Sequence, residues 1–185
     1  MTAAQLMNTR IRLEPPSMGL WRQNLEAVRE SEHELRLFLD WVDHALTEEE
    51  TIQNIRDAID QFESFTTELR YSIVRQSDER FLGMIGLLIG DPATPTYEIG
   101  YWLRSSETGK GYMRDAVSLL EHHVFTQLGA EQIEIRTEPA NHSSRTVAER
   151  SGYILVSHLS ADRQRPSGEW EDTLVYLKTR GQAGY

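Results

Sequence analysis

A glycine-rich junction with a lysine is the first stretch of this sequence that could do chemistry. Residues 106–113 read S-E-T-G-K-G-Y-M and join an apolar, aromatic segment to one with helical spacing. The first turn of a helix presents unpaired N–H groups and the positive end of its dipole, and glycine lets the backbone approach an anion closely. A strand, a glycine-rich turn and a helix form a generic phosphate cradle, to which Lys110 adds a positive charge. The alternative is an ordinary glycine-rich turn, because the Walker and dinucleotide patterns are both missing.

Composition and charge narrow the functions that this junction can serve. The chain has 185 residues, 39% apolar and 26% charged, which is typical of one domain over residues 1–185 with a core of its own. It has no cysteine, which excludes disulfides, zinc–thiolate sites and a cysteine nucleophile. The net charge of -10 argues against nucleic acid as a direct ligand and suits a basic partner or an amine; the alternative is that it only confers solubility.

The sequence carries no signal for export or for membrane insertion. Its N-terminus lacks the pattern of a signal peptide, and its apolar runs are too short to cross a bilayer. We therefore expect a cytoplasmic protein with no membrane partner.

Helical periodicity and cap residues predict the helices that must position the junction. Thr47 and Glu50 form a capping box, a hydroxyl followed three residues later by a carboxylate, and Gly129 suits the end of a helix. The predicted helices are 20–28, a short one capped by Ser31, one that follows Thr47, 112–128 and 143–150.

Alternating apolar residues predict seven strands. Residues 81–89 are apolar on both faces, which is typical of a central strand, and residues 90–95 and 161–169 read as loops, the second with Arg163 and Arg165 in solvent. The predicted strands are 10–14, 70–75, 81–89, 97–103, 132–137, 153–159 and 170–177. This order predicts a mixed α/β fold with an antiparallel front half.

Three stretches carry a family resemblance. The words E-I-G-Y-W-L (98–103), G-K-G-Y-M (109–113) and N-H-S-S-R-T-V-A-E-R-S-G-Y (141–153) resemble the GNAT superfamily of acyl-CoA N-acyltransferases, in particular its RimJ/RimL-type branch, which acetylates ribosomal-protein N-termini. The resemblance covers nearly the whole chain. It implies the α/β (α+β) GNAT fold, a mostly antiparallel central sheet of about seven strands that is flanked by helices and splayed between its fourth (97–103) and fifth (132–137) strands.

The resemblance implies acetyl-CoA as co-substrate and no metal. The family's pyrophosphate motif, Q/R-x-x-G-x-G/A, reads T-G-K-G-Y-M here, with Thr108 in place of the leading side chain and a Met at the end, as the branch often has. The splayed fourth strand would bond the pantetheine amides. The coenzyme A contacts implied in this way are Ile99, Tyr101, Leu103, Thr108, Gly109, Lys110, Gly111, Tyr112, Met113, Asn141 and Ser144.

The same resemblance assigns a base and an acid. An N-terminal amine has a pKa of about 7.7 to 8, against about 10.4 for lysine, so a modest base is enough to neutralise it. Glu98, acting through water, is the implied general base; the alternative is a carboxylate exposed at a strand end. Ser144 is the implied acid for the leaving thiolate, because Ala148 stands where many members have a tyrosine. Asn141 and Ser144 are also ordinary helix N-cap residues, and both roles can coexist.

The acceptor remains open between three hypotheses. The first is the N-terminal α-amine of a protein, which the resemblance places on a ribosomal protein; the second is a small amine such as a polyamine, amino acid or aminoglycoside. The third is a domain that binds acyl-CoA without catalysis. Trp41 and Trp170 either floor an acceptor pocket or belong to the core. His122 and His123 are adjacent on a helix, so they do not face each other as metal ligands would. The resemblance to the RimJ/RimL-type branch also suggests a homodimer.

Overall fold

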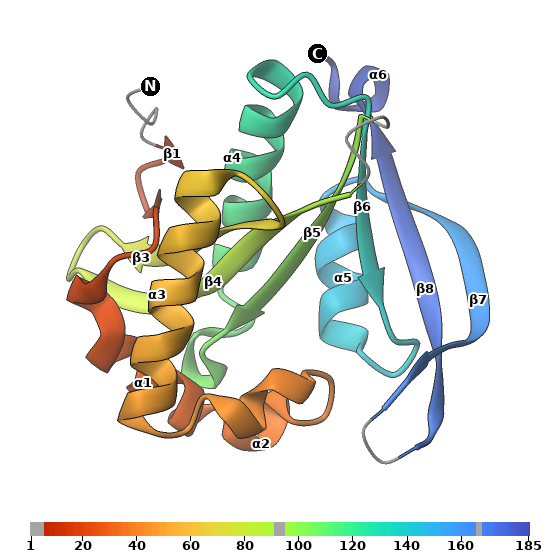
Figure 1. Cartoon of the computed structure of the whole chain (residues 1–185). Helices are drawn as coiled ribbons and strands as arrows, with labels where there is room; N and C mark the ends of the chain where they lie inside the picture. Colours follow the sequence, from red (N-terminus) through yellow and green to blue (C-terminus); the bar gives the residue numbers. More distant parts are fainter. Residues whose placement is uncertain (1–5, 91–94, 166–167) are drawn as a thin grey trace.

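One open sheet of eight strands organises the chain (Figure 1). The computed structural model describes residues 6–90, 95–165 and 168–185. The strand order is β1-β2-β3-β4-β5-β6-β8-β7, and the only parallel pair in it is β5 with β6. The strands are β1 Leu6–Met7, β2 Ile11–Glu14, β3 Glu68–Arg75, β4 Arg80–Ile89, β5 Thr96–Leu103, β6 Gln132–Thr137, β7 Ile154–Gln164 and β8 Trp170–Thr179.

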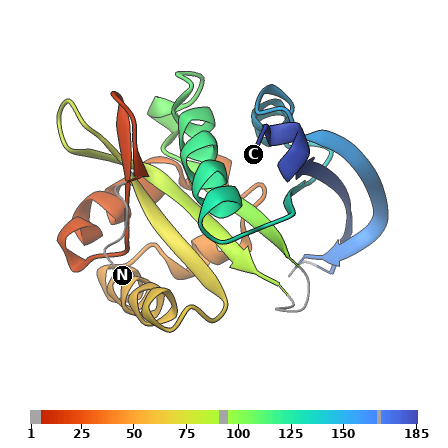
Figure 2. The same cartoon turned by 90° about the horizontal axis from the view of Figure 1, so that it is seen from above.

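Helices cover both faces of this sheet. Figure 2 shows α4 and α5 on one face and α1 and α3 on the other. The α-helices are α1 Trp21–Glu30, α2 Glu32–Leu35, α3 Glu48–Ser64, α4 Tyr112–Thr126, α5 His142–Arg150 and α6 Arg180–Ala183. Three 3-10 helices complete the list, η1 Met18–Leu20, η2 Asp40–His44 and η3 Ser105–Glu107.

The main core lies between the sheet and α4. Helix α4 turns Val117, Leu120 and Val124 inward at helical spacing, and all three are fully buried. They belong to the same apolar cluster as Ile99 of β5 and Ile133 of β6. This packing fixes the glycine-rich junction, which directly precedes α4, against the end of β5.

Several local predictions are confirmed. Thr47 and Glu50 form the predicted capping box, with both reciprocal hydrogen bonds present. Gly129 has a left-handed φ of 71°, which suits the turn after α4, but the helix ends at Thr126 and its C-cap is Gln127 rather than Gly129. The strand predicted over residues 132–137 has those bounds in the structure.

Other local predictions are wrong, because tertiary contacts decide them. Ser31 precedes α2 but its side chain does not cap it; the hydroxyl accepts a hydrogen bond from the Ser105 N–H instead, at 2.8 Å. The sheet has eight strands rather than seven, since β1 pairs with β2. Strand β7 continues to Gln164, so Arg163 belongs to a strand and not to a solvated loop. Residues 91–94 of one predicted loop and 166–167 of the other lie outside the described residues.

The predicted splay lies between β5 and β6. Their register ends after three pairs, the last of which joins Glu98 to Glu134. Beyond that point β5 continues beside β4 as far as Leu103, while β6 continues beside β8 as far as Thr137. The two parallel strands therefore part at the level of Ile99.

Candidate active site

The glycine-rich junction has the backbone geometry of an anion cradle. Gly109 and Gly111 have φ values of 74° and 85°, in the left-handed region that glycine adopts at little cost. Gly111 is the N-cap of α4, and its carbonyl accepts the first helical bond, from the Asp115 N–H at 3.1 Å. The amides of Tyr112, Met113 and residue 114 therefore precede the first intrahelical bond and can serve an external acceptor.

The side chains of the junction mostly serve the protein itself. The Lys110 ammonium, predicted as a positive charge for the cradle, lies 3.0 Å from the buried Glu107 carboxylate. Burial alone would raise the pKa of Glu107, but hydrogen bonds and charges from Lys110 and Arg75 outweigh it and hold that pKa below its usual value. The Thr108 hydroxyl donates to the Ser105 carbonyl at 2.9 Å, and the Met113 side chain is buried in the core. What the junction offers a ligand is chiefly backbone.

Arg10 braces the cradle, and no local sequence signal predicts this. It donates to the Lys110 carbonyl and to the Asp115 carboxylate, both at 2.7 Å. Its guanidinium carbon lies 4.5 Å from the centre of the Tyr112 ring, in cation–π range. These partners lie about a hundred positions from Arg10 in the sequence, so only the folded chain brings them together.

The segment between β5 and the cradle is anchored to α1. The Ser106 N–H donates to the Glu30 carboxylate at 3.2 Å, and the Arg104 guanidinium donates to it at 2.8 Å. Burial opposes ionisation of Glu30, yet the bonds from Ser106 and Arg104 prevail and lower its pKa. With the Ser31–Ser105 bond, these contacts connect the cradle to helices on the opposite face of the sheet.

The splay leaves one edge of β5 without a strand partner. The Arg104 N–H donates to the Leu82 carbonyl at 2.7 Å, so alternate residues of β5 direct their backbone groups toward β4. Ile99, Tyr101 and Leu103 direct theirs to the other side, beyond the last β5–β6 register pair. Buried backbone groups need partners, and a bound chain of amides would supply them here.

Asn141, Ser144 and Tyr101 meet at the start of α5. The Asn141 side-chain oxygen caps the helix by accepting from the Ser144 N–H at 3.0 Å, so capping uses only the backbone of Ser144. The Ser144 hydroxyl lies 3.2 Å from the Tyr101 phenol, which also donates to the Ser144 carbonyl at 3.2 Å. Burial raises the pKa of Tyr101 to about 12, so the phenol keeps its proton near neutral pH. This side-chain contact of Tyr101 comes in addition to the backbone contact that the sequence predicts.

Glu98 lies on the other face of β5 from Tyr101, because side chains alternate along a strand. Its carboxylate is 3.6 Å from the Arg136 guanidinium and is about one third exposed, so it is not the fully exposed strand-end group of the alternative interpretation. Burial raises the pKa of Glu98; Arg136 opposes this rise and Glu134, directly across the sheet, adds to it. A partly buried carboxylate with a raised pKa suits general base chemistry.

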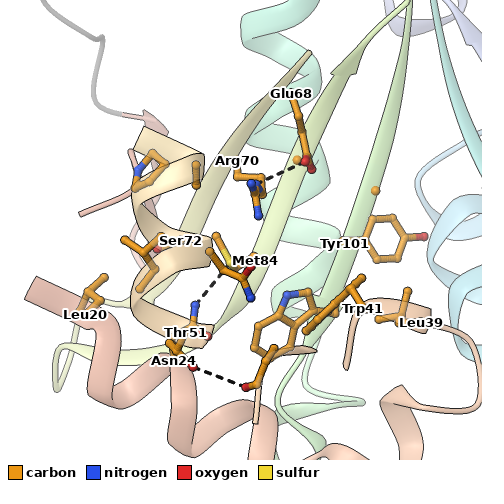
Figure 3. Close-up of a pocket in the computed structure, with 18 of the residues that line it drawn as sticks. Leu20, Asn24, Leu39, Trp41, Thr51, Glu68, Arg70, Ser72, Met84 and Tyr101 are labelled. Atoms are coloured by element: carbon orange, nitrogen blue, oxygen red, sulfur yellow. Dashed lines mark hydrogen bonds and ion pairs between the residues drawn. The ribbon is translucent and has the colours of Figure 1, made fainter. Parts of the chain in front are cut away.

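A cavity of about 330 Å³ opens on the same face as Glu98, between the sheet and α1 and α3 (Figure 3). Gly86 and Gly100, paired across β4 and β5, leave space at its floor. Glu68 and Arg70 lie toward one end, 3.3 Å apart. Sequence reasoning missed this cavity, although two mid-strand glycines can signal close approach of a ligand.

The predicted tryptophans separate in the structure. Trp41 lines the cavity, with its ring 5.8 Å from that of Trp102, whereas Trp170 at the start of β8 is 59% exposed. Neither belongs to the buried core.

Arg163 and Arg165 are held by ion pairs, although Arg163 is exposed and Arg165 lies in the loop that follows β7. Both pair with the Glu138 carboxylate, and they donate to the carbonyls of Phe38 and Leu37, respectively. They therefore join the end of β7 to the segment that follows α2.

No membrane-crossing helix and no metal-binding group were found in the described part of the chain. Its helices are too short or too polar to span a bilayer. Its histidines and carboxylates form no group of three or more that could hold a metal ion.

Sequence comparison shows that this chain is similar to proteins named as acetyltransferases. The Bacillus subtilis (strain 168) protein named Probable N-acetyltransferase YjcK is 33% identical over 109 residues, 58% of this chain and 60% of that protein. The Escherichia coli (strain K12) ribosomal-protein-serine acetyltransferase is 28% identical over 121 residues, 65% of this chain and 66% of the relative. The chain thus matches less than two thirds of the length of either protein.

Solved structures share the fold at low identity. The ribosomal alpha-N-protein acetyltransferase RimL, in complex with coenzyme A, superposes with a TM-score of 0.85 at 22% identity, covering 93% of this chain and 95% of that one. The microcin C7 self-immunity acetyltransferase MccE, in complex with acetyl-CoA and AMP, gives 0.85 at 20% identity, covering 93% of each.

A family profile described as an acetyltransferase (GNAT) domain matches residues 10–154, from the start of the sheet through the cradle and α5. Because this match spans most of the chain, the protein belongs to the GNAT acetyltransferase family.

Proposed function

We propose that this protein transfers the acetyl group of acetyl-CoA to a primary amine, and we assign the N-terminal α-amine of a protein as that acceptor. The observation that carries the proposal is the splay of β5 from β6 next to a glycine-built helix N-terminus. A splayed strand provides partners for amides, and the cradle provides N–H groups for a diphosphate. Coenzyme A has both chemical features.

The residues that would hold coenzyme A follow from this placement. The backbone of Ile99, Tyr101 and Leu103 would bind its pantetheine amides, and residues 108–113 would bind its diphosphate through the cradle. Asn141 and Ser144 begin α5 beside the splay, where the Asn141 side chain fixes the helix start. When bound, acetyl-CoA supplies an activated acetyl group.

We assign the proton transfers to two side chains on opposite faces of β5. Glu98 removes a proton from the acceptor amine through water, on the side of the cavity. Ser144 donates a proton to the departing sulfur, on the side of α5. Reactants that lie at the open edge between β5 and β6 would be within reach of both faces of β5.

Two kinds of acceptor have support. A protein N-terminus is favoured because relatives and fold neighbours are named ribosomal-protein acetyltransferases, and a net charge of -10 suits a basic target. A small amine is the second candidate, because the cavity of about 330 Å³ can enclose one. MccE, a fold neighbour, is named a self-immunity acetyltransferase.

Release of free thiol from acetyl-CoA tests the proposal. The full chain is assayed with a panel of peptides that differ in their first residues, with the same peptides blocked at the N-terminus, and with polyamines, amino acids and aminoglycosides. Turnover that disappears on N-terminal blocking supports a protein α-amine. Heat stabilisation by coenzyme A without turnover on any amine would contradict the enzyme and indicate a binding module.

Mass spectrometry of a cell extract then identifies the acceptor. Enzyme and isotope-labelled acetyl-CoA are added, and newly labelled N-termini, lysine side chains and small amines are compared with an extract that received no enzyme. Labelling confined to protein N-termini is the expected result.

Glu98→Gln is expected to lower kcat/KM by about a hundredfold, within the range for loss of a general base. Since burial raises the pKa of Glu98, the rate of the native enzyme should fall as pH drops through a value above the ordinary 4.3 of a glutamate, where the carboxylate becomes protonated. The variant should lose this acid limb and keep only that of the acceptor amine. A pH series of kcat/KM measures both.

Glu134→Gln is the matched control, since Glu134 lies opposite Glu98 in the register and carries the same charge. It should change the rate by no more than about threefold, the scale of a modest electrostatic change. Equal losses in the two variants would reduce Glu98 to a structural carboxylate.

A further inference from the structure

Tyr101 connects the cavity to Ser144. It is among the residues that line the cavity, yet its phenol reaches the start of α5 on the other side of β5. Figure 3 shows its ring at the edge of the cavity, with the hydroxyl directed away from Glu68, Arg70 and Met84. The ring packs against the main core, so its position is fixed.

The contacts of the phenol concern one residue. Its oxygen is 3.2 Å from both the hydroxyl and the carbonyl oxygen of Ser144. The Ser144 hydroxyl is not needed for the helix cap, because the Ser144 N–H makes that bond with Asn141. The phenol has one proton, which it can donate either to the Ser144 carbonyl or to the Ser144 hydroxyl. When it donates to the hydroxyl, Ser144 can present its own proton elsewhere.

We infer that Tyr101 is a positioning residue and proton relay for Ser144, holding its hydroxyl in place and returning a proton to it as that hydroxyl protonates the leaving sulfur. This inference rests on the proposed function. It deepens that proposal, because it names the group that keeps Ser144 from ending the step as an alkoxide.

The proton count of the step is balanced. The acceptor nitrogen forms a bond to the acetyl carbon, the carbon–sulfur bond breaks, and the electron pair stays on sulfur. The sulfur takes the Ser144 proton, Ser144 takes the Tyr101 proton, and the nitrogen gives one proton to Glu98. Glu98 then loses its proton to water, and Tyr101 regains one from solvent after the products leave, so the enzyme is unchanged.

The chemistry favours a phenol for this task. A phenol is a much stronger acid than an aliphatic hydroxyl, so the charge left behind is better accommodated on Tyr101 than on Ser144. With a pKa of about 12, Tyr101 still keeps its proton at working pH and is ready to donate it. The competing interpretation is that the phenol only anchors α5 through the Ser144 carbonyl.

Tyr101→Phe tests the inference, because it removes the hydroxyl and keeps both the ring and the backbone. We expect kcat to fall on the order of tenfold, as for loss of one hydrogen bond in the rate-limiting step, with the KM for acetyl-CoA unchanged. Tyr97→Phe is the matched control, since Tyr97 points to the same face of the same strand and also packs against the core. It should leave kcat unchanged.

A double variant separates relay from anchoring. If Tyr101 acts through the Ser144 hydroxyl, adding Tyr101→Phe to Ser144→Ala should cost no further activity. If Tyr101 only anchors α5, its removal should cost the same in both backgrounds and should weaken coenzyme A binding as well. That second pattern overturns the inference.

A spectroscopic measurement provides a readout that does not depend on activity. Fluorotyrosine at position 101 has a more acidic phenol, and its ¹⁹F NMR signal reports its ionisation. Since Ser144 stabilises the ionised phenol through a hydrogen bond, Ser144→Ala should raise the pKa of this probe. An unchanged pKa contradicts the contact itself.

The outcomes for the inference and for the proposed function are distinct. A native enzyme that fails to release thiol with any of the amines contradicts the proposed function, whatever the NMR result. A native enzyme that is active, with Tyr101→Phe equal to it at every pH, contradicts only the role of Tyr101.

Discussion

Replacing Gly111 with valine is expected to weaken coenzyme A binding by at least about a hundredfold, close to abolition. Gly111 has a φ of 85°, where an L-residue costs about 1–2 kcal/mol and a β-branched one is a genuine outlier. The new side chain would also stand where a diphosphate must approach the first amides of α4, and 3.6 Å from the Arg10 guanidinium. Calorimetric titration with coenzyme A measures the dissociation constant directly.

The same substitution at Gly129 controls for backbone strain. Gly129 also has a left-handed φ, 71°, but it follows the other end of α4 and has open space around it. Gly129→Val should lower the unfolding temperature as Gly111→Val does, while coenzyme A affinity stays near that of the native protein. Unchanged affinity in Gly111→Val would show that the diphosphate binds elsewhere.

Replacing Ser144 with alanine should slow turnover by about a hundredfold or more, the range for loss of a general acid. Coenzyme A affinity should change little, because the cap of α5 uses the Ser144 backbone and the Asn141 side chain, which both remain. Single-turnover kinetics and a separate binding titration distinguish the two quantities. The pattern expected is a reduced kcat with a nearly constant dissociation constant.

Ser143→Ala is the neighbouring control. Ser143 occupies the next position of the same helix, but it is exposed, so its hydroxyl can be removed without disturbing a buried contact. It should behave as the native enzyme. Equal loss of turnover and binding in Ser144→Ala would reduce Ser144 to a structural residue.

The elements that the sequence predicts well are those that depend on near neighbours. The α3 capping box is specified by Thr47 and Glu50, three residues apart, and the left-handed turn after α4 by Gly129 alone. The turn at Gly109 and Gly111 is equally local, so its place between β5 and α4 could be predicted, while its affinity for anions stays a prediction. The long run of apolar residues at helical spacing likewise predicts α4.

The elements that the sequence misses depend on residues far away. Serine is a common helix-capping residue, which is why Ser31 is a reasonable candidate. Its hydroxyl instead accepts a hydrogen bond from the amide of Ser105, 74 positions further along the chain. Strand β1 has two residues and exists only through its pairing with β2, which leaves almost no period to detect. Such features need the fold before they can be foreseen.

The residues of the candidate site likewise include some that motifs predict and some that only the fold shows. Glu98 and Ser144 could be named from motifs, although their assigned roles remain predictions. The contact of Tyr101 with Ser144 spans 43 positions and that of Arg10 with Lys110 spans 100, and neither pair has a spacing that a helix or strand would reveal. The cavity joins three strands with two α-helices and two 3-10 helices, so its volume is a property of packing alone.

Helix α1 lines the cavity through Asn24 and, at its last residue, binds the cradle segment through Glu30. The same helix would thus contact both proposed substrate sites. Coupling between two binding sites is reciprocal. By whatever factor bound coenzyme changes the affinity for the acceptor, the bound acceptor changes the affinity for the coenzyme.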